Sequence, residues 1–134
     1  MDNFKASESV GRLATVWLGR QVLITIDRPI GSSHPELPEL IYSLNYGYIP
    51  GTLAGDGEPI DIYLIGESHP LTTAVVFVVA IIHRHNDDED KLVGSYDPRP
   101  TTPGEVMQAV KFVEHWYDVT IQTQSGNVNY TRGQ

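Results

Sequence analysis

Residues 72–85 read TTAVVFVVAIIHRH, and this stretch is the strongest indication of the fold class in the sequence. β-Branched and aromatic residues dominate it, and apolar side chains occupy both faces from Val75 to Ile82. A strand of fourteen residues, at about 3.3 Å per residue, is longer than most strands. Because apolar residues on both faces need protein on both sides, we expect the segment to coil around a closed β-barrel, which has no exposed edges.

Shorter runs of β-forming residues are expected to complete a mostly β fold of the α+β class. These runs are residues 13–18, 22–27, 46–49, 60–65 and 92–93. Residues 13–18 and 22–27 flank Gly19-Arg20, and this spacing predicts a hairpin with glycine in the turn. Residues 29–38 are rich in Gly, Ser and Pro, follow neither regular period, and are expected to form an exposed loop.

One helix is expected after the proline-rich stretch that ends at Pro100. Thr102 can cap it, Pro103 can be its first residue, and Glu105 can reach back to the cap, as in a capping box. Apolar residues then recur with the 3.6-residue period of a helix packed on the barrel: Val106, Val110, Val113 and Tyr117. Residues 118–134 are expected to hold one strand and a frayed tail.

The composition indicates one domain, residues 1–134. A chain of 134 residues with 40% hydrophobic residues can bury one core, whereas two domains would each be small. The chain has no cysteine, which excludes disulfides and thiolate metal sites and favours a reducing, cytoplasmic location. The longest apolar run, residues 74–82, is far shorter than the ~20 residues that span a bilayer, so we expect no membrane partner.

The net charge of −8 argues against a nucleic-acid partner. Binding a phosphate backbone depends on clustered Lys and Arg, and the chain has only nine of these residues. An acidic protein can still bind a negatively charged substrate if its carboxylates first collect divalent cations, which invert the local field.

The first acidic cluster lies in the segment NYGYIPGTLAGDGEPIDI, residues 45–62. Asp56, Glu58 and Asp61 fall within six residues around a turn, and their mutual repulsion favours a bound cation. Ile60 and Ile62 face one side of the following strand, so Asp61 faces the other and can point to a barrel mouth. Hard oxygen ligands at this density suit Mg²⁺, Mn²⁺ or Ca²⁺. On spacing alone, an ordinary acidic hairpin turn is the alternative interpretation.

A second acidic cluster, NDDEDK at residues 86–91, lies where the long strand ends. Taken alone it could be a solvated loop. Strand ends on one rim of a small barrel converge on one cavity, however, so the two clusters together favour a shared metal site.

The order of these motifs resembles that of the soluble inorganic pyrophosphatases. Asn-Tyr-Gly-Tyr-Ile at 45–49 precedes Asp-Gly-Glu-Pro-Ile-Asp at 56–61, and an acidic stretch then ends in Lys-Leu-Val at 91–93. The similarity runs from about residue 13 to 117, and residues 56–61 are its most specific part, with Glu58 where an Asp is usual. It implies a five-stranded OB-like closed barrel with one or two flanking helices, a homo-oligomer, and hydrolysis of the small molecule pyrophosphate with Mg²⁺, or Mn²⁺ in its place.

The resemblance also implies roles for individual residues. The metal ligands are Asp56, Asp61, Asp90 and Asp87. The substrate-phosphate ligands are Arg28, Tyr46 and Lys91. Glu58 is the general base for the attacking water. Because the family has an Asp two residues before the Lys, Glu89 is an alternative to Asp90, and Asp88 is an alternative to Asp87.

The chain departs from the family where phosphate-binding lysines are usual. Ala14 and Val16 stand at positions of the family's amino-terminal hairpin that carry charged residues, and Trp116-Tyr117 stands where a Tyr-Lys pair is expected. His34, in the 29–38 loop, is a candidate replacement donor. Two rival functions therefore stay open: hydrolysis of an organic or nucleoside diphosphate, and a non-catalytic relative that binds metal or phosphate.

Other residues have simpler interpretations. His83 and His85 alternate onto one strand face as imidazole metal ligands often do, but strand-end histidines are more often surface residues, and nearby oxygen ligands favour a harder cation. The remaining aromatic residues that attract notice are expected in the core: Trp17, Tyr48, Tyr63 and Trp116.

Overall fold

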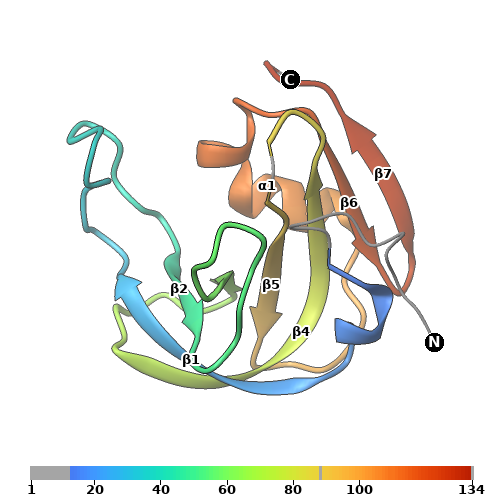
Figure 1. Cartoon of the computed structure of the whole chain (residues 1–134), viewed down its shortest axis with the longest axis horizontal. Coiled ribbons are helices and arrows are strands. Elements are labelled where there is room, and N and C mark those ends of the chain that lie inside the picture. Colours follow the sequence, from blue (N-terminus) through green and yellow to red (C-terminus); the bar gives the residue numbers. More distant parts are fainter. Residues whose placement is uncertain (1–12, 88, 134) are drawn as a thin grey trace.

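The computed structural model describes residues 13–87 and 89–133 (Figure 1). Within these residues the elements are η1 (Thr15–Trp17), β1 (Gln21–Arg28), β2 (Asn45–Ile49), β3 (Ile60–Ile65), β4 (Thr73–Arg84), β5 (Lys91–Ser95), α1 (Pro103–Glu114), β6 (Val119–Thr123) and β7 (Gly126–Tyr130). No helix of the described part is long and apolar enough to cross a membrane.

The strands form one sheet in the order β1-β2-β3-β5-β4-β6-β7, and β1 also pairs with β4. This extra pairing closes β1, β2, β3, β5 and β4 into a barrel, around which β4 curves in Figure 1. β4 pairs with two strands along one of its edges: residues 73–77 pair with β1 and residues 80–84 pair with β6. Its opposite edge pairs with β5. The predicted five-stranded barrel and its long coiling strand are therefore confirmed.

Alternation along each strand divides the core into two layers. Ile62 and Leu64 of β3 point into the barrel, whereas Tyr63 between them packs outward with residues of α1. The helix is held at its start by the predicted capping box, in which Glu105 N–H donates to the Thr102 side chain and the Glu105 carboxylate accepts from Thr102 N–H. The inner layer sets the barrel shape, and the outer layer fixes α1 against it.

The prediction of a strand at residues 13–18 is wrong, because a 3₁₀ turn stands there. Trp17 N–H donates to the Ala14 carbonyl at 3.1 Å, and Gly19 then turns the chain with a φ of 89°. A longer first strand would need the edge of β4 beyond Val78, and β6 already occupies that edge. The strand begins only at Gln21, where β4 is free to pair with it.

Residues 118–134 also differ from expectation, because the described part of this segment holds two strands. β6 and β7 form a hairpin that extends the sheet beyond the barrel, seen beside α1 in Figure 1. Of the four aromatic residues placed in the core, Tyr63 is buried, and Trp17 and Tyr48 are half-buried. Trp116 is 46% exposed, since α1 ends at Glu114 and the ring lies beyond the face that packs on the barrel.

Residues 29–44 connect β1 to β2 and project away from the barrel (Figure 1). The prediction of an irregular loop is correct for most of this segment, but its two arms pair with each other. Tyr42 N–H donates to the Ser32 carbonyl and His34 N–H to the Leu40 carbonyl, each at 2.9 Å, and Ser33 and Ile41 form an antiparallel bridge. These bonds give the projecting segment a defined shape.

Candidate active site

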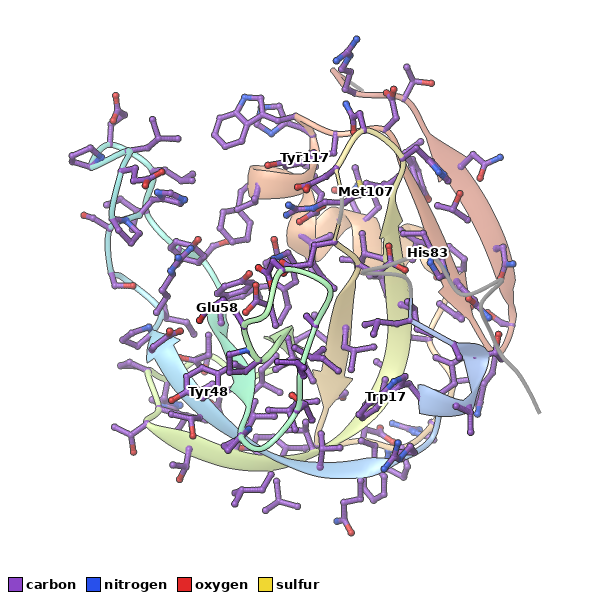
Figure 2. All side chains as sticks on the ribbon, viewed as in Figure 1. Trp17, Tyr48, Glu58, His83, Met107 and Tyr117 are labelled. Atoms are coloured by element: carbon purple, nitrogen blue, oxygen red, sulfur yellow. The ribbon has the colours of Figure 1, made fainter. Side chains whose placement is uncertain are left out.

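The turn between β2 and β3 presents the first acidic cluster. The Asp56 carboxylate accepts the backbone N–H of Glu58 at 2.9 Å, and Gly57, with a φ of 86°, allows the chain to turn between them. Glu58 remains exposed (Figure 2). Asp61 follows on β3 and points away from the barrel interior that Ile60 and Ile62 fill.

Two neighbouring cavities share residues at this end of the sheet. The carboxylate cavity, of about 470 Å³, is lined by Asp27, Arg28, Tyr48, Asp56, Glu58, Pro59 and Asp61. The cationic cavity, of about 160 Å³, is lined by Arg28, His34, Tyr42, Tyr46, Asp61, Tyr63, Arg84, Lys91, Val113 and Tyr117. Arg28 and Asp61 line both, so the two cavities are parts of one candidate site with an acidic side and a basic side.

Lys91 connects the basic side of the site to its acidic side. Its ammonium donates to the Asp61 carboxylate at 2.5 Å and to the Glu89 carboxylate at 2.7 Å, and the side chain is only 7% exposed. Tyr46 donates its hydroxyl hydrogen to the same Asp61 oxygen at 2.8 Å. Burial acts to lower the pKa of Lys91, but Tyr46 and Asp61 raise it more, so Lys91 is a fixed positive charge.

Arg28 supplies a second positive charge from the end of β1. Its guanidinium donates to the Tyr42 hydroxyl at 2.6 Å and lies 5.3 Å from the centre of the Tyr46 ring. Burial acts to lower the pKa of Arg28, but the hydrogen bond to Tyr42 and the charges of Tyr42, Tyr46 and Asp27 together raise it more, so the net pKa rises. Within the described residues no carboxylate forms an ion pair with Arg28, which leaves its charge available to an anion.

The second acidic cluster divides between two sides of the chain. Glu89 points to the site, where one oxygen binds Lys91 and the other, Oε2, is buried without a hydrogen-bond partner among the described residues. Asp90 points elsewhere: its carboxylate is 0% exposed, lies 2.6 Å from Nδ1 of His83 and accepts the N–H of Leu13 at 2.9 Å. The structure thus brings Glu89, the alternative ligand, to Asp61 and holds Asp90 away from it.

The environment of Glu89 is unusual for a carboxylate. Burial and the nearby Asp56 carboxyl raise the pKa of Glu89 to about 7. The same interaction with Glu89 lowers the pKa of Asp56, because a neighbouring carboxyl that keeps its proton favours the ionised form of Asp56. Two neighbouring carboxyl groups repel each other when both are ionised, and a bound divalent cation would stabilise the doubly ionised form.

Asp87 also lies apart from the acidic turn. Its carboxylate binds the Arg84 guanidinium at 2.9 Å, and Arg84 in turn binds Glu114 of α1 with two nitrogens, at 2.6 and 2.9 Å. Asp88, the alternative to Asp87, lies outside the described residues. Arg84 packs 3.8 Å from the Tyr117 ring centre and lines the cationic cavity.

The sequence did not single out Arg84 as a site residue. Its partner Glu114, 0% exposed, is 30 positions away on another element, so no local motif marks the pair. Only the position of Arg84 at the charged end of an apolar strand hints that a partner must exist, because a buried arginine is rarely unpaired.

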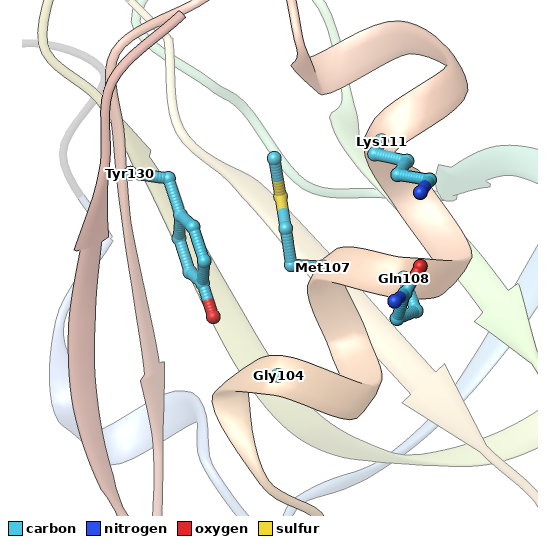
Figure 3. A pocket seen from close by; sticks show the side chains of 5 residues that line it. All are labelled: Gly104, Met107, Gln108, Lys111 and Tyr130. Carbon is cyan, nitrogen blue, oxygen red and sulfur yellow. The ribbon is translucent and has the colours of Figure 1, made fainter. Parts of the chain in front are cut away.

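His83, His85 and a third cavity lie outside this candidate site. His83 Nε2 contacts Gln122 at 2.8 Å and His85 contacts Thr120 at 2.6 Å, so each imidazole has its own partner. In Figure 2 His83 is well separated from Glu58. A further cavity of about 390 Å³ between α1 and β7 is lined by Gly104, Met107, Gln108, Lys111 and Tyr130 (Figure 3). It has no carboxylate and is unsuited to divalent cations.

The donor set fits a hard divalent cation. Asp27, Asp56, Glu58 and Asp61 offer only oxygen ligands to one cavity, and the unpartnered Oε2 of Glu89 lies beside them. Within residues 13–87 and 89–133, no three His, Cys, Asp or Glu side chains are already grouped to hold a metal. The Lys91 ammonium lies between two of these carboxylates, 2.5 Å from Asp61 and 2.7 Å from Glu89.

Comparisons with known proteins identify the family and the fold. The family described as inorganic pyrophosphatase matches residues 27–131. An inorganic pyrophosphatase of Aeropyrum pernix is 26% identical over 113 residues, which cover 72% of this chain and 61% of that protein, so the chain spans less than two thirds of its length. Solved inorganic pyrophosphatases of Ehrlichia chaffeensis (TM-score 0.58, 16% identity, 90% of each chain) and Thermus thermophilus (0.57, 22% identity, 91% of this chain and 88% of that one) share the fold.

Proposed function

This chain belongs to the inorganic pyrophosphatase family, and from that premise we propose that it hydrolyses inorganic pyrophosphate to two phosphates with divalent cations. The observation that carries the proposal is the pair of joined cavities, one lined by carboxylates and one by cations, with Asp61 and Arg28 common to both. A diphosphate with bound cations has this same division of charge.

The metal side of the site would use oxygen ligands only. We assign Asp56, Asp61 and Glu89 as ligands, with Mg²⁺ the preferred ion and Mn²⁺ an alternative. Glu89 replaces Asp90 in this set because Asp90 is held by His83 and Leu13. Asp87 is left out because it is bonded to Arg84. Cations bound there would neutralise substrate charge and lower the pKa of an attacking water.

The chain's own residues would orient the substrate and move one proton. Arg28 and Lys91 would hold the phosphoryl oxygens and stabilise the charge that develops on the leaving phosphate. Tyr46, which now donates to Asp61, would donate to a phosphate oxygen or keep Asp61 in place. Glu58, exposed at the rim of the carboxylate cavity, would accept the proton of the water that attacks phosphorus.

Measured phosphate release tests the proposal. The purified chain is incubated with pyrophosphate, with nucleoside diphosphates and with nucleoside triphosphates, each with Mg²⁺, Mn²⁺ or a chelator. We expect release from pyrophosphate that requires the metal and exceeds release from the organic substrates. Preference for an organic diphosphate would favour the rival hydrolase, and no release from any of them would favour the non-catalytic relative.

We also propose that residues 1–134 act as one pyrophosphatase-like domain and as a homo-oligomer, as the family resemblance implies, and that they act in the cytoplasm, because a chain with no cysteine suits a reducing compartment. Sedimentation of the purified chain and microscopy of a fluorescent fusion would test the oligomer and the location.

A further inference from the structure

The loop between β1 and β2 places an imidazole in the wall of the cationic cavity. His34 lies among the lining residues with Arg28, Lys91 and Tyr42. The loop that carries His34 projects beyond the strands of the barrel (Figure 1). A polar ring in the wall of an anion-binding cavity can contribute to binding if one of its nitrogens donates.

The hydrogen bonds of the ring determine which nitrogen that is. The backbone N–H of Glu36 donates to Nδ1 of His34 at 3.0 Å, so Nδ1 is an acceptor and the ring hydrogen is on Nε2. Among the described residues no acceptor takes this hydrogen. The ring therefore has an N–H donor that no protein group uses.

The position of the ring is fixed on two sides. It stacks on Tyr42, with ring centres 6.3 Å apart and planes 13° apart, and Tyr42 accepts from Arg28 at 2.6 Å. The backbone of His34 is held by its bond to the Leu40 carbonyl, at 2.9 Å. A donor that is already in place loses little conformational freedom when a ligand binds.

We propose that His34 is a substrate-binding residue whose Nε2–H donates to a phosphate oxygen of the diphosphate beside Arg28. The inference rests on the proposed function and adds a donor from the loop to the two cations of the cavity. Because the donor contacts a phosphoryl oxygen that is negative throughout the reaction, it should strengthen substrate binding more than it accelerates chemistry.

Kinetics of His34→Ala and His34→Gln test this role. In His34→Ala we expect the KM for pyrophosphate to rise about tenfold to hundredfold, the range for one hydrogen bond to a charged group, with kcat within about threefold of the parent. His34→Gln, whose amide N–H can reach the place of Nε2, should recover most of the loss. His69→Ala is the control, since that ring is 82% exposed and bonds to Glu67.

An unchanged KM in His34→Ala would overturn the proposal, as would a loss of kcat alone that His34→Gln fails to recover. Calorimetric binding of imidodiphosphate, a non-hydrolysable analogue, separates this result from the fate of the proposed function. If the parent does not hydrolyse pyrophosphate but binds the analogue more tightly than His34→Ala does, the role of His34 stands without the enzyme. If parent and variant bind it equally, or the parent does not bind it, the proposal falls.

Discussion

The assignment of Glu89 in place of Asp90 predicts opposite effects for two neighbouring substitutions. In Glu89→Gln the amide oxygen can still accept from Lys91, while the carboxyl whose pKa is raised by burial and by Asp56 is removed. In Asp90→Asn the amide can still accept from Leu13, while the charge beside His83 is lost. The first change should stabilise the metal-free protein, and the second should destabilise it.

The pKa of Glu89 sets the size and the pH dependence of the first effect. A rise in pKa from 4.5 to about 7 corresponds to about 3 kcal/mol before any screening. Solvent screening reduces this value, so we expect Glu89→Gln to stabilise the protein by about 1–3 kcal/mol. The folded state holds this proton more tightly than the unfolded state does. The parent therefore loses stability as pH rises from about 4.5 to about 7, and the difference between variant and parent grows over the same window. Asp90→Asn should cost about 1–3 kcal/mol, because it removes a buried charge-assisted hydrogen bond.

Urea unfolding in chelator at pH 5, 6, 7 and 8 measures both effects, and melting with millimolar Mg²⁺ measures metal binding by mass action. Glu89→Gln should reduce the Mg²⁺-induced rise in Tm, and Asp90→Asn should keep it. The assignment is refuted if Asp90→Asn abolishes that rise while Glu89→Gln retains it, or if Glu89→Gln shows no pH-dependent gain in stability.

Three further substitutions, together with one control variant, test the substrate contact, the general base and the packing of the barrel. Arg28→Ala should raise the KM for pyrophosphate about tenfold or more and leave the urea midpoint nearly unchanged, because its bond to Tyr42 is half-exposed; an unfolded variant would show a structural role instead. Glu58→Gln should lower kcat by ~10²–10⁴ and keep the Mg²⁺-induced rise in Tm, as for loss of a positioned base; equal losses of metal binding and activity would make Glu58 a ligand. Gly47→Ala should destabilise by about 3 kcal/mol or more in urea unfolding, since its Cβ would lie 1.8 Å from the Thr25 carbonyl oxygen, whereas Gly104→Ala, with open space around it, should not destabilise.

The sequence predicted the parts of the site that local patterns determine. Asp56 and Glu58 share one turn, and Asp61 follows on a strand whose alternation is unambiguous, so their shared cavity could be expected before any coordinates. The barrel could also be predicted from a local pattern, because β4 is a long strand with apolar residues on both faces.

The rest depended on contacts between distant residues. Each residue of the acidic run before Lys91 carries a carboxylate, so the sequence pattern cannot tell whether Glu89 or Asp90 points into the site. The contact between Asp90 and His83 in the folded protein determines that Asp90 points away from it. The pairing of Arg84 with Glu114 is equally non-local. Residues 13–18 have the composition of a strand, but β6 occupies the edge of β4 on which they would have to pair.

The decisive experiment on metal-dependent hydrolysis is phosphate release from pyrophosphate by the parent and by Asp61→Asn, with Mg²⁺, with Mn²⁺ and with chelator. Asp61 is the carboxylate common to the acidic and basic cavities and binds both Lys91 and Tyr46. We predict metal-dependent release by the parent and a loss of about a hundredfold or more in Asp61→Asn, with the fold retained by circular dichroism. Release at the parent's rate by Asp61→Asn, or no release by the parent with either Mg²⁺ or Mn²⁺, would contradict the account.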